Sequence, residues 1–481
     1  MQSFFSWITR QEVLFGLAIL ILSYFTYAHN YTTPDALYWD ENYHIASAQK
    51  YLNGTFFMEQ HPPLGKMLIA LGEKIVDAND GDNQFLTTDY AQTLPDKFSF
   101  AGYRLFPVLF AWLAAPMLYL IFLLITRSSL SAFFLSFLYV FDNALIVHGR
   151  AAMLDAIMLT LCIAMILLHL LILRWKDERN LFPLASLIFG LTFGALLTTK
   201  VLGLIMILLV PVILWELRGH WNKVAQFLAL TFAGFLIAYI AVWQVHFSLG
   251  KTVVPSLPDN GYYQASQEYK DLVTAGNTNF KVMLRDSLAF VKHYNGGVPE
   301  LDLTKIDENG SPFFFWPVGG RSISYRWETP DGNSYQYLYL QVNPAVWILS
   351  LLGIFLAAAL LACSQLVPMK EALPYRKELL IWFGMYASYM IAVSQIHRVM
   401  YLYHYFLPLS FSFILFAYVF MSLKQMGVLK LTEERKRWLL LGMGVFIFFG
   451  FQFYRPLSYY SPLTDAHSNV AQFSHCGSYI A

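Results

Sequence analysis

The chain has 481 residues, of which 57% are hydrophobic, 17% aromatic and only 13% charged, and its mean hydropathy is +0.48. A soluble globular protein carries about 25% charged residues and about 45–50% apolar ones, so these proportions exclude an ordinary soluble protein. The formal net charge of +1 excludes a basic nucleic-acid binder, and three cysteines are too few for a disulfide framework. The composition predicts an all-α protein that crosses a membrane many times.

A helix needs about 20 apolar residues to cross the hydrocarbon core of a bilayer, and eleven runs along the chain approach or exceed that length. The first run lacks a small-residue cleavage site, so we expect a retained span and not a signal peptide. Only a tight turn at 198–200 separates the fifth run from the sixth. The eleven predicted spans lie near 12–29, 104–126, 130–147, 152–173, 182–199, 200–217, 224–247, 343–364, 378–396, 403–422 and 438–454.

Lys and Arg gather in the loops that are cytoplasmic if the N-terminus is inside, whereas each short outer turn holds one such residue. This bias predicts that the N-terminus lies inside and the C-terminus outside. The sequence then divides into four parts. They are an N-terminal membrane module of seven spans (1–247) that includes a first outer loop (30–103), an outer subdomain (248–342), a C-terminal membrane module of four spans (343–454) and an outer tail (455–481).

The two long outer segments differ in pattern. In the first, apolar residues recur at helical spacing from Leu64 to Ile75, directly after Pro62-Pro63, and Pro suits the first turn of a helix. This pattern predicts an amphipathic helix that lies in the membrane interface. In 248–342, Gly, Pro and aromatic residues indicate an irregular subdomain with some strand near 335–341.

Ionisable side chains within the spans gather at what is predicted to be the outer end. Such residues are costly in lipid and mark function by default, although any one of them could reach water by snorkelling. A transporter would place its polar groups near the midplane. The distribution favours an enzyme at the outer membrane surface over a lipid or sugar transporter. The residues are Arg104, Asp142, His148, Arg150, Asp155, Lys200, His246, His397, Arg398 and His404.

Two adjacent carboxylates, Asp40 and Glu41, follow the first span. A carboxylate at this position can act as a general base toward a hydroxyl at the interface, although such pairs more often cap a helix or face solvent. Neighbouring carboxylates do not easily point the same way, so one is expected to face a substrate and the other to bind a structural partner. His61 is either a residue of the active face or a helix cap.

Several short motifs follow one another in a specific order: Asp40-Glu41, His61-Pro62-Pro63-Leu64-Gly65-Lys66, Gly149-Arg150 to Leu154-Asp155, Lys200 with Gly203, His246-Phe247, Asn343-Pro344 with Trp347, and Tyr403-His404-Tyr405. This ordered set resembles the motifs of the protein O-mannosyltransferases, which form glycosyltransferase family 39 of the GT-C superfamily. The resemblance covers residues from about 38 to 460. It implies a GT-C fold of about eleven transmembrane helices with outer-side loops.

The chain departs from the eukaryotic members of that family in one respect. Those members carry a β-trefoil MIR domain between the seventh and eighth spans, and residues 248–342 are too few to form it. The chain therefore looks like the bacterial relatives that lack the MIR domain. This likeness implies a bacterial inner membrane, with the active site on the outer side, more than an endoplasmic reticulum.

The resemblance implies an inverting glycosyltransferase that moves a sugar, expected to be mannose, from a polyprenyl phosphate to Ser or Thr hydroxyls of exported proteins. An alternative keeps the donor and changes the acceptor to a lipid A or polysaccharide hydroxyl, as in aminoarabinose-transferase relatives. The expected partners are the lipid-linked donor, an exported protein or peptide, and membrane lipid, but no nucleic acid. Dimer formation stays open, because eukaryotic relatives pair.

The same resemblance assigns roles to residues. Asp40 is the expected base, and Glu41 orients the acceptor or the scaffold. The departing phosphate needs cations, and Arg suits bidentate contacts while Lys acts as a point charge. No cofactor is expected, and no metal site is indicated because the histidines are scattered singly, although some GT-C enzymes use divalent ions. The expected phosphate-binding residues are Arg398 and His404, then Lys200 and Arg150, with Arg104 placed to pair with a carboxylate or the phosphate. Further candidates for the active face are His61, Tyr403, which could belong to an interfacial aromatic belt, and Asp155, which could instead pair with Arg150.

Overall fold

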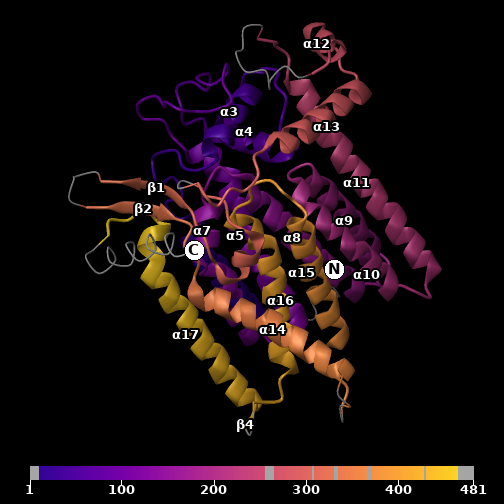
Figure 1. Cartoon of the computed structure of the whole chain (residues 1–481). Helices are drawn as coiled ribbons and strands as arrows, with labels where there is room; N and C mark the ends of the chain where they lie inside the picture. Colours follow the sequence, from indigo (N-terminus) through magenta and orange to yellow (C-terminus); the bar gives the residue numbers. More distant parts are fainter. Residues whose placement is uncertain are drawn as a thin grey trace. The chain divides into compact units, whose positions relative to one another are not determined.

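The computed structural model describes residues 10–254, 265–305, 308–329, 334–366, 368, 371–426 and 429–463. The described chain is mostly helical with a few short strands, which confirms the predicted fold class (Figure 1). It forms two compact units, each assembled from segments that are far apart in sequence. The first unit comprises Met1–His29, Trp112–His148 and Glu300–Ala481, and the second comprises Asn30–Ala111 and Gly149–Pro299.

In the described part of the chain, the first unit consists of long apolar helices and two pairs of short antiparallel strands. Ser128 caps α6 by accepting from the backbone N–H of Ser131, and Thr432 caps α17 in the same way. Strands β1 and β2 pair antiparallel, with Arg326 opposite Leu338. Its elements are α2 (Arg10–Ser23), α6 (Ser129–Val140), α7 (Asn143–Gly149), β1 (Ser324–Glu328), β2 (Gln336–Tyr339), α14 (Pro344–Leu366), α15 (Arg376–Ser394), α16 (Phe406–Ser422), β3 (Gln425–Met426), β4 (Leu429–Lys430) and α17 (Glu433–Ser458).

Helices α6 and α7 are one apolar run that bends by 63°. At the bend, Asp142 Oδ1 accepts the backbone N–H of Leu145 at 2.9 Å and so caps α7. Its Oδ2 accepts the indole N–H of Trp347 at 2.9 Å and the backbone N–H of Asn343 at 3.3 Å. Asp142, one of the ionisable residues predicted at the outer end of the spans, therefore has a structural role. Its carboxylate accepts hydrogen bonds from backbone N–H groups at the bend and next to it.

The second unit combines apolar helices with the first long loop segment (30–103) and with the part of the second long segment that precedes residue 300. Helices α9 and α11 lie side by side (Figure 1), and glycines permit their close approach: a Cβ on Gly190 would lie 2.0 Å from the carbonyl oxygen of Thr231. Its elements are α3 (Glu41–Leu52), α4 (Leu64–Val76), α8 (Leu154–Arg174), α9 (Leu181–Leu197), α10 (Leu209–Glu216), α11 (Trp221–Leu249), α12 (Gln267–Thr274) and α13 (Phe280–Gly297), while α5 (Ala101–Thr126) contributes to both units.

Each of the eleven predicted apolar runs contains a helix, but fewer of these helices meet the requirements of a full span. Among the described residues, seven helices are long and apolar enough to cross a membrane, or eight if the bent pair α6–α7 is one span. The runs 181–197 and 201–216 are helical but shorter. A polytopic membrane protein is thus confirmed, while the count of eleven and the predicted orientation stay predictions.

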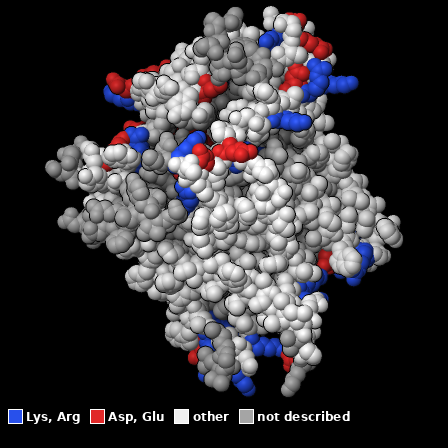
Figure 2. All heavy atoms as spheres, in the orientation of Figure 1, with Lys and Arg blue, Asp and Glu red and all other residues white. Residues whose placement is uncertain are grey.

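The outer segments also follow the predicted patterns. The amphipathic helix is α4, which buries Ile69 and Ala70 and leaves Leu71 and Ile75 exposed. The strand expected near 335–341 is β2. On the face shown in Figure 2, Lys, Arg, Asp and Glu side chains lie over α12 and α13, and few lie along α11. Because α11 is apolar and mostly unburied, the exposed side of this helix suits contact with lipid.

Candidate functional site

The ion pair of Glu41 and Arg104 fixes the start of helix α3. The Nε of Arg104 lies 2.7 Å from Glu41 Oε1, Nη2 lies 2.8 Å from Oε2, and both side chains are fully buried. The carboxylate also accepts the backbone N–H groups of Ala152, at 2.8 Å, and Tyr38, at 3.3 Å. Glu41 therefore has a structural partner, as expected for one of the two adjacent carboxylates.

The rest of the Arg104 guanidinium binds the segment that leads into α3. Its Nη1 donates to the carbonyls of Thr32 and Pro34 at 2.6 and 2.7 Å, and Nη2 donates to Ala36 at 2.8 Å. A guanidinium has five N–H donors, and all five are used by these bonds and by Glu41. The geometry thus matches the carboxylate-pairing alternative for Arg104 and leaves no N–H for a phosphate.

Asp40 precedes α3 at its N-cap position and is half-buried. Its carbonyl oxygen accepts the backbone N–H groups of Tyr43 and His44, at 3.1 and 3.3 Å, which begin the helix. Trp39 before it has a φ of 52°, in the left-handed region. The start of a helix favours negative charge, so this position suits an ionised carboxylate next to the immobile Glu41.

His44 completes the attachment of α3 to the segment around Ala152. Its Nδ1 donates to the carbonyl oxygen of Ala152 at 2.8 Å. The backbone N–H of Ala152 in turn donates to Glu41. Burial, together with the charge of Lys66, lowers the pKa of His44 to about 3. The imidazole is therefore neutral at physiological pH and acts as a fixed hydrogen-bond donor.

Two other predicted residues of this unit form an ion pair. Lys200 Nζ lies 2.7 Å from Asp155 Oδ1, and both side chains are almost fully buried. Arg150 is also buried, and its Nη2 donates to the carbonyl oxygen of Asn30. Lys200 is thus an ion-pair partner of Asp155, and the pairing of Asp155 with Arg150 stays a prediction.

The motif around His61 joins α4 to two other segments. The N-cap of α4 is Pro63, so the alternative that His61 caps this helix is wrong. The backbone N–H of Leu64 donates to the carbonyl of Thr198 at 2.8 Å. A Cβ on Gly65 would lie 2.5 Å from Leu154 Cδ2, which explains why the motif has a glycine there. His61 itself is half-buried, and its backbone N–H donates to Glu59.

The remaining predicted residues belong to the first unit. His404 is buried, stacks on Tyr403 and Trp316, and its Nδ1 lies 3.0 Å from the carbonyl oxygen of Tyr401. Tyr403 also stacks on His148, with ring centroids 4.6 Å apart. Arg398 is half-buried, and its guanidinium has no ion-pair partner among the described residues. Among the predicted phosphate ligands, Arg398 is therefore the least buried residue.

The sequence reasoning missed a buried ion pair beside α3. Lys66 Nζ lies 2.6 Å from Glu59 Oε1 and 3.1 Å from Ser47 Oγ, and Lys66 and Glu59 are both nearly inaccessible. Lys66 is the last residue of the motif that begins at His61. The resemblance pointed to this motif but assigned no role to its lysine. Nearby, burial lowers the pKa of Lys50 to about 7, although its Nζ lies 3.3 Å from Asp89.

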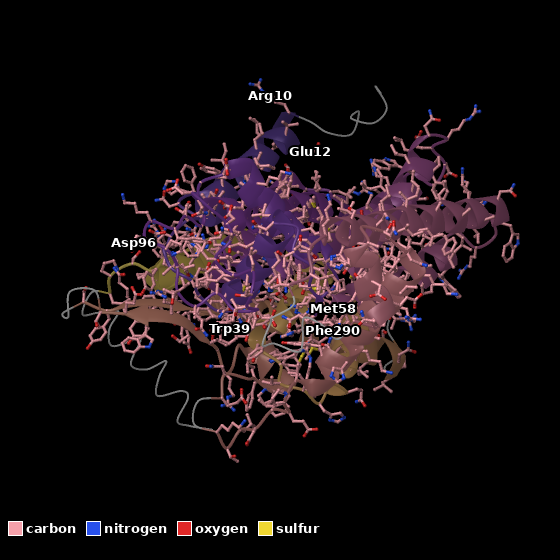
Figure 3. The ribbon with its side chains drawn as sticks, turned by 90° about the horizontal axis from the view of Figure 1, so that it is seen from above. Arg10, Glu12, Trp39, Met58, Asp96 and Phe290 are labelled. Atoms are coloured by element: carbon pink, nitrogen blue, oxygen red, sulfur yellow. The ribbon has the colours of Figure 1, made fainter. Side chains whose placement is uncertain are left out.

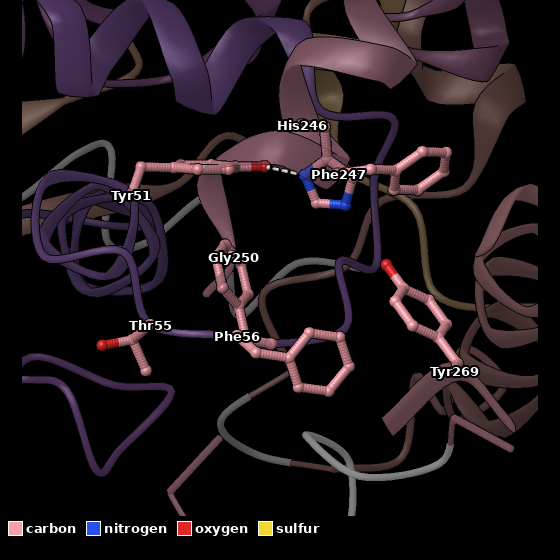
Figure 4. Close-up of a pocket in the computed structure, with 8 residues that line it drawn as sticks. Tyr51, Thr55, Phe56, His246, Phe247, Gly250 and Tyr269 are labelled. Carbon is pink, nitrogen blue, oxygen red and sulfur yellow. Dashed lines mark hydrogen bonds between the residues drawn. The ribbon is translucent and has the colours of Figure 1, made fainter. Parts of the chain in front are cut away.

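A second missed contact joins α3 to α11. The hydroxyl of Tyr51 lies 2.8 Å from His246 Nδ1, and both residues line a small cavity of about 10 Å³ together with Thr55, Phe56 and Tyr269 (Figure 4). A cavity of this size holds at most about one water molecule. The pair thus anchors the end of α11.

Among the residues that the structure describes, no three His, Cys, Asp or Glu side chains are placed to share a metal ion.

Comparisons with known proteins point to one family. A model of dolichyl-phosphate-mannose-protein mannosyltransferase matches residues 17–250, and a model of the C-terminal four-transmembrane region of protein O-mannosyltransferase matches residues 287–475. Protein O-mannosyl-transferase 2 of Danio rerio is 26% identical over 293 residues, which are 56% of this chain and 36% of that protein. Dolichyl-phosphate-mannose–protein mannosyltransferase 3 of Saccharomyces cerevisiae is 26% identical over 265 residues, 51% of this chain and 35% of that protein. The matches thus span about a third of these relatives' length.

Solved structures show the same fold. The S. cerevisiae protein O-mannosyltransferase Pmt1-Pmt2 complex bound to the sugar donor gives a TM-score of 0.79 at 13% identity and covers 95% of this chain and 91% of that one. The archaeal oligosaccharyltransferase AglB from Archaeoglobus fulgidus gives 0.53 at 12% identity, covering 95% and 57%. The two family models together cover most of the chain, and the fold agrees with them. The chain belongs to the protein O-mannosyltransferase family of the GT-C superfamily.

Proposed function

We propose that the chain is an inverting membrane glycosyltransferase that moves mannose from a polyprenyl-phosphate donor to Ser or Thr hydroxyls of exported proteins. Both matching family models describe protein mannosyltransferases. The names of the relatives identify dolichyl-phosphate mannose as their donor and protein as their acceptor. These descriptions favour a protein acceptor over a lipid or glycan acceptor.

The observation that carries the proposal is the contrast between Asp40 and Glu41. Glu41 accepts four hydrogen bonds and is fully buried, so it cannot take a proton from a substrate without losing its partners. Asp40 is only half-buried and stands at the start of α3. We therefore assign the base to Asp40 and the role of positioning residue to Glu41.

The reaction follows from this assignment. The Asp40 carboxylate accepts the proton of the acceptor hydroxyl while the hydroxyl oxygen forms a bond to C1 of mannose. The bond from C1 to the phosphate oxygen breaks, and its electron pair leaves with the lipid phosphate. Attack from the face opposite the phosphate inverts the anomeric centre, as in other inverting glycosyl transfers. The proton ends on Asp40, and the phosphate monoester of the lipid is the second product.

Cations must stabilise the leaving phosphate, and the candidates differ in how many of their donors are already used. Arg104 has none left, and Lys200 is paired with Asp155. Arg398 has no ion-pair partner among the described residues. We therefore place Arg398 first, with His404, and put Arg150 and Lys200 second. His61, Tyr403 and Asp155 stay candidates for the active face.

We further propose that the protein lies in a bacterial inner membrane with its outer loops on the non-cytoplasmic side, following the distribution of Lys and Arg. The predicted division into 1–247, 248–342, 343–454 and 455–481 describes the order of the segments along the chain, whereas the compact units combine distant segments. Dimer formation stays open for this chain.

The proposal is tested with purified protein in nanodiscs. Polyprenyl-phosphate mannose is supplied with a Ser/Thr-rich peptide, with lipid A or with a polysaccharide, and the products are identified by mass spectrometry. We expect one hexose to be added to the peptide and none to the other acceptors. Transfer to lipid A or polysaccharide alone would contradict the protein acceptor, and no transfer from any donor and acceptor would contradict the enzyme.

A further inference from the structure

A cavity of about 120 Å³ lies beside helix α3, in the outer part of the second unit. One water molecule needs roughly 10–15 Å³ on the same measure, so this cavity is large enough for a small side chain. Its lining comes from α3, from the segment before α4 and the first turn of α4, from Asp89 after α4, and from α13. The lining residues are Tyr43, Ser47, Phe57, Met58, Glu59, Gln60, Lys66, Asp89, Phe290 and Tyr294.

The cavity combines a charged floor with apolar and aromatic walls. Glu59 and Lys66 are each at most 3% exposed and form the ion pair described above. Glu59 Oε2 is buried and accepts no hydrogen bond from the described residues. Lys66 Nζ has three N–H donors, of which Glu59 Oε1 and Ser47 Oγ take two. Met58 and Phe290, which Figure 3 labels close together, belong to the wall.

A group that both donates and accepts a hydrogen bond would complete this floor. Its donor would satisfy Glu59 Oε2, and its acceptor would take the third N–H of Lys66. A buried carboxylate oxygen without a donor is costly, so such a ligand gains from both contacts. Primary amides and hydroxyls have this character, and they are the end groups of Asn, Gln, Ser and Thr.

The position of the cavity along α3 relates it to Asp40. Residues 40, 43 and 47 follow the i, i+3, i+7 spacing of one helix face, and Tyr43 and Ser47 line the cavity. Seven residues of helix rise by about 10.5 Å, and an extended peptide covers about 3.3 Å per residue. A peptide with its hydroxyl at Asp40 would thus place a side chain about three residues away at the cavity.

We propose that this cavity is an acceptor subsite, which binds an uncharged polar side chain about three residues from the Ser or Thr that is modified. The inference rests on the proposed function, because it assumes a protein acceptor and measures the distance to the cavity from Asp40. A peptide is favoured over the donor because no lining residue belongs to a membrane-spanning helix, whereas a lipid-linked donor is approached from the membrane.

The test measures peptide binding and transfer separately. Fluorescent peptides carry one Thr in an Ala/Gly background, with Gln or its apolar counterpart Met three residues before or after the Thr. Anisotropy with the protein in nanodiscs gives Kd, and mass spectrometry gives KM for peptide and donor. For the wild type we expect the Gln peptide to bind about tenfold tighter than the Met peptide in one of the two directions, as for a hydrogen bond to a charged group.

Three variants examine the cavity. Gln60→Trp fills it from a half-buried position, and Gln92→Trp is the matched control, because Gln92 is exposed in the same outer segment and does not line the cavity. Glu59→Gln removes the charged acceptor, and Glu59→Gln with Lys66→Met removes both charges, which is better tolerated than removal of one partner. We expect Gln60→Trp and the double variant to lose the preference for Gln while the donor KM stays within about twofold.

The outcomes separate the two proposals. A wild type that binds Gln and Met peptides equally, or variants that keep the preference, would overturn the subsite. A rise in donor KM with unchanged peptide binding would also overturn it and would assign the cavity to the donor. Peptide binding that depends on the cavity, without transfer of mannose, would support the subsite and contradict the proposed enzyme.

Discussion

The guanidinium of Arg104 and the carboxylate of Glu41 face each other through two hydrogen bonds of 2.7 and 2.8 Å, and neither side chain is exposed. The same guanidinium holds the carbonyls of 32, 34 and 36, so one residue fixes both the entry segment and the first turn of α3. Because Asp40 lies between these anchored points, its backbone has little freedom. The ion pair therefore positions a carboxylate that it does not itself contact.

We predict that Arg104→Met destabilises the protein strongly, because it leaves the Glu41 charge buried without a partner. Removal of one member of a buried pair costs about 3–5 kcal/mol. The apparent melting temperature in detergent measures the effect. Arg285→Met is the control, since Arg285 pairs with Glu268 and Asp286 at an exposed position. Equal melting temperatures for the two variants would contradict the structural role of Arg104.

Asp40→Asn is expected to abolish mannose transfer, because an amide cannot take the proton of the acceptor hydroxyl. Donor and peptide binding should remain, and the free energy of unfolding should change by no more than about 0.5 kcal/mol, because Asn suits the N-cap position about as well as Asp. Mass spectrometry of the peptide and binding assays measure these effects. The matched control is Asp80→Asn, at an exposed position of the same outer segment. Transfer by Asp40→Asn at the wild-type rate would refute the base assignment.

Arg398→Ala is expected to raise the donor KM, because a cation that stabilises the phosphate is lost. Arg398→Lys should restore part of the affinity through its charge but not a bidentate contact. Peptide KM and the melting temperature should stay close to the wild type, since the guanidinium has no ion-pair partner to lose among the described residues. A donor KM that is unchanged in Arg398→Ala would remove this residue from the phosphate site.

The sequence predicted the helices more completely than their breaks. Apolar periodicity between Leu64 and Ile75 located α4, because the alternation of buried and exposed positions is local to the helix. The run at 130–147 gave no sign of the 63° bend at Asp142. The residues that satisfy this bend, Asn343 and Trp347, are about 200 positions away in sequence, so local patterns cannot show it.

The site was predicted unevenly for the same reason. Reasoning from two adjacent carboxylates anticipated that one would take a structural partner, and Glu41 does. It could not show that Arg104, 63 positions later, uses every donor for that purpose. Nor did the sequence show that Glu59 and Lys66 meet in a buried cavity, because seven residues across a Pro-Pro turn give no fixed separation.

The pH dependence of stability provides a further test of the outer segment. Burial lowers the pKa of Lys50 to about 7, below its ordinary value of 10.5. Between these two pH values the unfolded chain binds more protons at this residue than the folded chain does, so the free energy of unfolding rises with pH, by at most about 1.4 kcal/mol per pH unit. This stabilisation is complete above pH 10.5 and is lost as the pH falls toward 7.

We therefore predict that the melting temperature of the wild type rises between pH 7 and pH 9 relative to that of Lys50→Met, which has no proton to release at this position. The range avoids lower pH, where Glu73 contributes in the opposite sense: its pKa is raised to about 7 by burial, so its stabilisation is lost as the pH rises from 4.5 to 7. Lys74→Met, at an exposed position of α4, is the control and should keep the wild-type profile. Parallel profiles for the wild type and Lys50→Met would show that Lys50 keeps its proton in the folded protein, and that Asp89 and the carbonyl of Thr88 outweigh the cost of burial.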